Sequence, residues 1–211
     1  MNIHQSPLPL LIIAAPLLAS IVLPVLGLWK RQAAYPVTLL VLLFSFGTSV
    51  LVAATVTSSG PIQYFMGGWE PPWGIEYRID HLGAIMLLLL TFITLLVAIY
   101  SKESIAAEAP DKEVPFYSVF LLLVSGLTGI VATADMFNLY VFLEITALSG
   151  YALISIGDRT AVVSAFRYVI LGTVGACFYL LSVSYLYSVT GSLNMADLAR
   201  ILPDLYQSRV V

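Results

Sequence analysis

Charged residues are scarce in this chain of 211 amino acids, since Asp, Glu, Lys and Arg make up 10% of it and hydrophobic residues 60%. A soluble domain carries about 25% charged residues, and a chain of this length could not hide so much apolar surface in its interior. The composition therefore excludes a soluble enzyme. The net charge of −3 provides no basic patch, so a nucleic-acid-binding protein is excluded as well.

Cysteine is nearly absent too, because the chain contains Cys177 alone. This residue lies inside an apolar stretch, so the sequence has neither a disulfide framework nor a cysteine-based metal motif. The two histidines, His4 and His81, lie far apart, and only Asp80 stands beside His81 as a further candidate ligand. We therefore expect no metal site and no bound redox cofactor.

The sequence contains long segments without any charged residue. They cover residues 1–29, 32–69, 81–101, 114–134 and 168–196. A run of about 18 or more mostly apolar residues is typical of a membrane-spanning helix. We predict an all-α, polytopic transmembrane bundle that forms one membrane domain over residues 1–211. Its spans, about six in number, are expected at about 8–28, 36–57, 82–100, 115–133, 137–156 and 162–189.

The positions of the basic residues predict the orientation of these spans. With the N-terminus outside, the inner segments carry Lys30, Arg31, Lys102, Lys112 and Arg159, and the outer ones carry Arg78, Arg200 and Arg209. Lys and Arg are enriched in cytoplasmic loops. Because this orientation places five basic residues inside and three outside, it favours an N-terminus outside the cell.

The link between the second and third predicted spans has structure of its own. Over residues 75–80 apolar and charged residues alternate, which is typical of a strand. Residues 62–66 could pair with it across the turn-rich segment 67–74. We predict an outer-face hairpin with Trp69, Trp73, Tyr64 and Tyr77 near the lipid headgroups. An irregular loop with interfacial aromatics remains the alternative, and in either case the charged side chains are expected to be solvated.

A short helix is predicted over residues 194–202, on the outer surface. Asn194 with Asp197 three residues later resembles a capping box. One helical face then carries Met195, Leu198, Ile201 and Leu202, and Pro203 is expected to end the helix. The mixed-charge segment 102–113 is expected to be a solvated connector.

Glu144 is the most informative residue, because it lies near the middle of the fifth predicted span. A carboxylate at that depth costs about 2.5–3.5 kcal/mol on insertion scales. Helical spacing places Tyr140, Leu148 and Tyr151 on its face, which should turn towards protein or water. We interpret Glu144 as a protonatable site of a proton relay. The alternative is a structural Glu whose hydrogen bonds are satisfied by neighbouring helices.

Arg167, in the sixth predicted span, is the second candidate. Its expected depth differs from that of Glu144 by about 10 Å, so only long side chains and a water could bridge the two. An Arg that reaches the inner interface is the alternative. Asp135 is expected to be a helix N-cap. Small residues on the span faces are expected to allow close helix packing; they are Gly126, Gly129, Gly172, Gly175 and Ala176.

Several segments resemble motifs of a known family. Residues 135–144 (DMFNLYVFLE) and 149–153 (SGYAL) resemble the fifth-helix motif of the antiporter-like membrane subunits. Residues 165–172 (AFRYVILG) resemble the sixth-helix motif of that family, and residues 190–198 (TGSLNMADL) the segment that follows it. Residues 67–80, which lead into the third predicted span, also resemble the sequence of that family. The family comprises the D subunit of Mrp-type cation/proton antiporters and the L, M and N subunits of the proton-pumping NADH:quinone oxidoreductase, respiratory complex I.

The resemblance implies a role for both candidates. In the family the fifth-helix Glu, here Glu144, is the charged residue of a proton half-channel and works with a Lys on the seventh helix. Arg167 occupies the position of the sixth-helix Lys. Because Arg hardly ever deprotonates, it could modulate Glu144 electrostatically but not pass a proton. Members have about fourteen helices, including two inverted five-helix repeats. The resemblance thus implies that the chain holds the first three helices and the start of the first repeat at about 115–189.

The resulting hypothesis is that the chain is the N-terminal portion of such a subunit and lies in the inner (plasma) membrane of a prokaryote. Its expected partners are the other membrane subunits of an Mrp or complex I-like assembly, the lipid bilayer, protons and Na⁺. Any NADH:quinone oxidoreductase activity would belong to the assembled complex. Three alternatives stay open: a truncated accessory or assembly protein without transport of its own, one piece of a split subunit, and, most distant, an unrelated intramembrane enzyme. The last would need a nucleophile–base pair or metal ligands within the spans, and the sequence shows neither.

Overall fold

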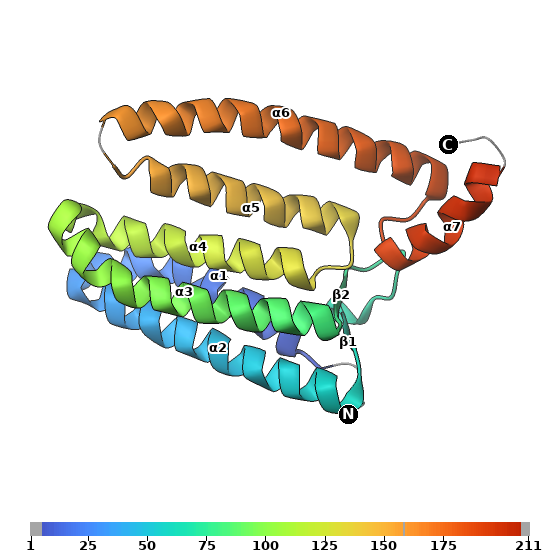
Figure 1. Cartoon of the computed structure of the whole chain (residues 1–211), viewed down its shortest axis with the longest axis horizontal. Coiled ribbons are helices and arrows are strands. Elements are labelled where there is room, and N and C mark those ends of the chain that lie inside the picture. Colours follow the sequence, from blue (N-terminus) through green and yellow to red (C-terminus); the bar gives the residue numbers. More distant parts are fainter. Residues whose placement is uncertain (1–5, 158, 208–211) are drawn as a thin grey trace.

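Six long helices run side by side and form the body of the molecule in the computed structural model, which describes residues 6–157 and 159–207 (Figure 1). They are α1 (Leu8–Trp29), α2 (Ala34–Ser59), α3 (His81–Glu108), α4 (Glu113–Ala132), α5 (Met136–Ile154) and α6 (Arg159–Thr190). All six are long and apolar enough to cross a membrane. The prediction of a polytopic helical membrane protein with about six spans is confirmed.

The core lies between the first four helices, with α4 at its centre. α4 packs against α1 on one side and α5 on the other, while α2 packs against α3. In the most apolar 18-residue stretch of the span that contains α4, 50% is buried. In the corresponding stretch of α6, 6% is buried. α6 is the outermost helix of the bundle and lies against α5 (Figure 1). The helix with the Arg167 candidate is therefore the least covered of the six.

Glycines allow the close approach of α4 to α5 and of α5 to α6. A Cβ atom on Gly126 would collide with Thr146, and one on Gly129 would collide with the ring of Phe142. A Cβ atom on Gly172 would collide with the hydroxyl of Tyr151. The predicted packing role is confirmed for these three glycines. It is wrong for Gly175, where a Cβ would meet none of the described residues within 4 Å.

A β-hairpin closes one end of the bundle, which we call the hairpin end. Strand β1 (Ile62–Phe65) pairs antiparallel with β2 (Glu76–Ile79), in a register that places Ile62 opposite Ile79. The hairpin is thus confirmed over the irregular loop. Its turn exposes Trp69 and Trp73. The expected headgroup position is wrong for Tyr77, which is buried because its ring packs on Phe142, at 6.5 Å between centroids.

The connector between α3 and α4 is more regular than predicted. α3 continues to Glu108, and a 3₁₀ turn (Pro110–Lys112) follows. Residues 102–109 contain neither Gly nor an internal Pro, so the backbone meets no residue that stops a helix. The Lys112 ammonium donates a hydrogen bond of 2.9 Å to the carbonyl of Ile156, two residues after the end of α5.

The short surface helix is α7 (Met195–Gln207), at the hairpin end. Asn194 caps it, since its Oδ1 accepts from the backbone N–H of Ala196 and Asp197 at 3.0 and 3.1 Å. Asp197 does not complete a capping box and instead pairs with Arg200 at 3.0 Å. The prediction that Pro203 ends the helix is wrong, because α7 runs past it. A proline removes one backbone donor but has a helical φ, so a short helix can contain it.

Candidate functional site

Glu144 lies near the middle of α5, and its side chain is half-buried. Tyr140 and Tyr151, which share its helical face, both contact α6. The Tyr140 ring stacks on Tyr179 with 6.1 Å between centroids, and Tyr151 meets Tyr168 edge-on at 4.7 Å. Glu144 is therefore placed between two aromatic contacts that join α5 to α6.

The opposite face of α5 makes the contact with α4. Phe142 and Thr146 are the side chains that lie against Gly129 and Gly126. Glu144 is two residues from each of them, so it points away from the tightly packed side of the helix. Leu148, one turn beyond Glu144, has 57% of its surface exposed. The face that carries Glu144 is thus partly covered by α6 and partly open.

Arg167 is exposed on α6 and lies one residue before Tyr168. Its neighbour Tyr168 contacts Tyr151, which is seven residues from Glu144. Seven helical residues span about 10 Å, which agrees with the separation expected from the sequence. Arg167 forms no ion pair with Glu144, since the ion pairs among the described residues are Arg31–Asp111 and Arg200–Asp197. A role for Arg167 would be electrostatic and at a distance.

Asp135 is the N-cap of α5, as predicted. Its Oδ1 accepts a hydrogen bond of 2.7 Å from the Asn138 backbone N–H. The carboxyl is buried, and this burial raises the pKa of Asp135 above its ordinary value, against the opposing effect of hydrogen bonds from the backbone of Asn138 and Phe137. The α5 helix therefore begins at a carboxyl group that the protein interior disfavours in its charged form.

A pH dependence follows from Asp135. The pKa of Asp135 is raised from 3.8 in the folded chain, so its protonated carboxyl favours the folded state. This contribution to the free energy of unfolding is fully present below about pH 4 and is lost as pH rises through the raised pKa. Asp135→Asn removes the titration and keeps a good N-cap. We expect the unfolding temperature of the wild type to fall, relative to that of Asp135→Asn, as pH rises above about 4. Thermal unfolding in detergent across the pH range measures this, and parallel curves for both proteins would contradict it.

Glu76 is buried, contrary to the expectation that it is solvated. Only 5% of its surface is exposed, and its Oε2 accepts a hydrogen bond of 2.7 Å from the Asn194 amide Nδ2. The same Asn194 caps α7 through its Oδ1. Glu76 thus holds the residue that starts α7, across 118 positions of sequence.

Backbone hydrogen bonds tie the same three segments together. The Ala134 N–H donates to the Glu76 carbonyl, the Met195 N–H to the Ala134 carbonyl and the Met136 N–H to the Leu193 carbonyl, each at 2.9 Å. Strand β2, the start of α5 and the start of α7 therefore form one junction at the hairpin end. The sequence indicates Asn194 as a cap, but no local pattern shows that a carboxylate so far away would bind it.

Metal-ligating side chains do not cluster in the part of the chain that the structure describes. No group of three or more His, Cys, Asp or Glu residues could hold an ion there. His81 lies at the start of α3, whereas His4 is outside the described residues. Cys177 is exposed on α6.

Comparisons with known proteins find relatives of this chain among membrane subunits. The family model of the NADH:quinone oxidoreductase/Mrp antiporter transmembrane region matches residues 132–210, and that of the complex I chain 5 N-terminus matches residues 69–108. The chain is 50% identical over 163 residues to NADH-quinone oxidoreductase subunit N of Desulforudis audaxviator, covering 77% of this chain and 32% of the relative. It is homologous to the antiporter-like membrane subunits. With the D subunit of the Na(+)/H(+) antiporter of Bacillus subtilis it shares 34% identity over 152 residues, covering 72% of this chain and 30% of that relative.

Solved structures agree with the relationship. A chain of the membrane-bound sulfane sulfur reductase, an archaeal respiratory membrane complex, matches with a TM-score of 0.88 and 35% identity, over 94% of this chain and 41% of that one. The Mrp complex from Dietzia sp. DQ12-45-1b shares the fold, with a TM-score of 0.79 and 24% identity over 92% and 36% of the two chains. This homologue of the antiporter-like subunits spans about a third of the length of the curated relatives it matches.

Proposed function

We propose that this antiporter-like chain is a membrane subunit of a proton-translocating NADH:quinone oxidoreductase or of an Mrp-type cation/proton antiporter, and that it contributes a proton half-channel through Glu144. The relatives named above, the N subunit of the oxidoreductase and the D subunit of the antiporter, support this class of assembly. Protons are the proposed cargo in both cases, with Na⁺ as the exchanged ion in the antiporter. The other membrane subunits of that assembly are the proposed partners.

The position of Glu144 is the observation that carries the proposal. A carboxylate in the middle of a membrane-spanning helix is costly and is retained mainly where it serves transport. Glu144 is half-buried there, on the side of α5 that faces α6 and not on the side packed against α4. A side chain in this place can take up a proton without disturbing the helix contact that holds α5. The test is the proton flux of the assembled complex after Glu144→Gln.

Arg167 is proposed as an electrostatic modulator of that site. A fixed cation about 10 Å away along the helices can act on the charge of the Glu144 site through space, without a direct contact. The orientation with the N-terminus outside, in the plasma membrane of a prokaryote, completes the proposal and rests on the distribution of basic residues.

The modulator role predicts a difference between two variants of Arg167. Arg167→Lys keeps the positive charge, so we expect proton flux close to that of the wild type. Arg167→Gln removes the charge and is expected to lower flux about threefold, a modest effect because the charge acts over about 10 Å and without a direct contact. Proton uptake into vesicles that contain the assembled complex measures both. Equal flux in the two variants would show that Arg167 is not a modulator.

A further inference from the structure

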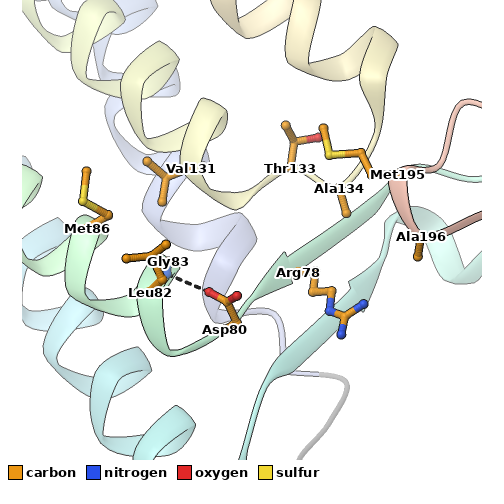
Figure 2. A pocket seen from close by; sticks show the side chains of 10 residues that line it. All are labelled: Arg78, Asp80, Leu82, Gly83, Met86, Val131, Thr133, Ala134, Met195 and Ala196. Atoms are coloured by element: carbon orange, nitrogen blue, oxygen red, sulfur yellow. Dashed lines mark hydrogen bonds between the residues drawn. The ribbon is translucent and has the colours of Figure 1, made fainter. Parts of the chain in front are cut away.

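A pocket of about 540 Å³ opens at the hairpin end, between the start of α3 and the start of α7. Figure 2 shows Arg78 on strand β2, Asp80 at the start of α3 next to Leu82, and Met86 one turn further along that helix. Val131 at the end of α4 lines it as well. The pocket thus combines two charged side chains with an apolar wall.

Its place along the bundle is the boundary between water and the apolar part of a membrane. Arg78 and Asp80 precede the span that starts at His81, and Leu82 and Met86 lie within that span. Exposed Trp69 and Trp73 in the same hairpin are side chains typical of the headgroup level. The charged edge is therefore at headgroup depth and the apolar wall at the depth of acyl chains.

The charges at this edge are available to a ligand. Arg78 is exposed, and the ion pairs found among the described residues do not include it. Asp80 uses Oδ1 to accept from the Gly83 backbone N–H at 2.8 Å, which leaves Oδ2 unused by that cap. The two residues are separated by one position in extended backbone, so both side chains lie on the same side of the strand, about 7 Å apart along it. A cation and an anion are thus presented side by side.

The apolar wall of the pocket offers a surface that an acyl chain can contact. Leu82 is 68% exposed and Met86 44% exposed on α3, one helical turn apart. Both face outward from the bundle, where an acyl chain can lie along them.

We propose that this pocket binds a phospholipid with a zwitterionic headgroup that carries a primary ammonium, a phosphatidylethanolamine. The phosphate pairs with the Arg78 guanidinium, the ammonium donates to the Asp80 carboxylate, and one acyl chain lies against Leu82 and Met86. An anionic lipid such as phosphatidylglycerol would bring its phosphate close to Asp80 without an ammonium to compensate. Phosphatidylcholine would match the charges, but its quaternary ammonium has no N–H to donate.

Native mass spectrometry of the purified full chain, with each of these three lipids added, tests the proposal. We expect phosphatidylethanolamine to be retained in preference to the other two. Arg78→Gln should lower its occupancy about three- to tenfold, the effect of losing a partly exposed charged contact. Asp80→Asn keeps a good N-cap for α3 and should shift the preference towards phosphatidylglycerol. Arg200→Gln, which changes an exposed Arg of α7 outside the pocket, is the matched control and should leave the preference unchanged.

Two results would overturn the proposal. The first is equal retention of the three lipids, or an Arg78→Gln variant that binds phosphatidylethanolamine as the wild type does. The second is density for a side chain of a neighbouring subunit in this pocket in a structure of the assembled complex. That outcome would make the pocket a protein contact instead of a lipid site.

Discussion

Glu144→Gln should lower proton flux through the assembled complex by about a hundredfold or more, the scale on which a proton-transfer group contributes to such a step. Gln has nearly the same volume as Glu and can form similar hydrogen bonds, but it cannot take up and release a proton. The half-buried position and the contacts of Tyr140 and Tyr151 with α6 should be retained. Flux into reconstituted vesicles, normalised to the amount of assembled complex, measures the effect.

The control for this experiment is Glu103→Gln, which makes the same chemical change at an exposed position near the end of α3. It should leave flux unchanged. If Glu144→Gln assembles normally and transports at the wild-type rate, the chain does not carry a proton through this residue. An accessory role without transport would then be the better description.

Gly129→Val should destabilise the folded chain by about 3 kcal/mol, at the upper end of the range for overpacked interiors. The new Cβ would collide with three atoms of the Phe142 ring. That ring is itself buried and lies against Tyr77 of the hairpin, at 6.5 Å between centroids, so it has little room to move. The contact between α4 and α5 would have to open. Unfolding in mixed detergent micelles measures the loss.

Gly150→Val is the matched control, because Gly150 also lies inside a membrane-spanning helix and a Cβ there would meet none of the described residues within 4 Å. Both variants have the same change in helix propensity, so their difference isolates the collision. Phe142→Ala in the Gly129→Val chain should recover part of the stability. Similar losses at Gly129 and Gly150 would contradict a close α4–α5 contact.

The spans and the hairpin could be predicted from the sequence because both depend on local patterns. A run of about 18 or more mostly apolar residues specifies a helix in a membrane whatever surrounds it. The alternation at residues 75–80 likewise specifies strand β2. The N-cap at Asp135 also depends on neighbours three residues away.

The junction at the hairpin end could not be predicted in this way. Alternation along β2 suggests one buried and one exposed face, yet Glu76 and Tyr77 point to opposite faces and both are buried. The reason is that the backbone of residues 133–135 covers the strand edge and Asn194 covers the Glu76 carboxylate. Only the tertiary arrangement brings these segments together. The extension of α3 to Glu108 escapes prediction for another reason, since a charged segment suggests a connector although charged residues form helix readily.

The most direct test of the central claim is infrared difference spectroscopy of the assembled complex, between its resting state and a state with a proton gradient imposed. We expect a carboxylic-acid band that changes with the gradient in the wild type, disappears in Glu144→Gln and persists in Glu103→Gln. A band that is unchanged in Glu144→Gln would show that the proton moves through another group and would contradict the role assigned to this residue.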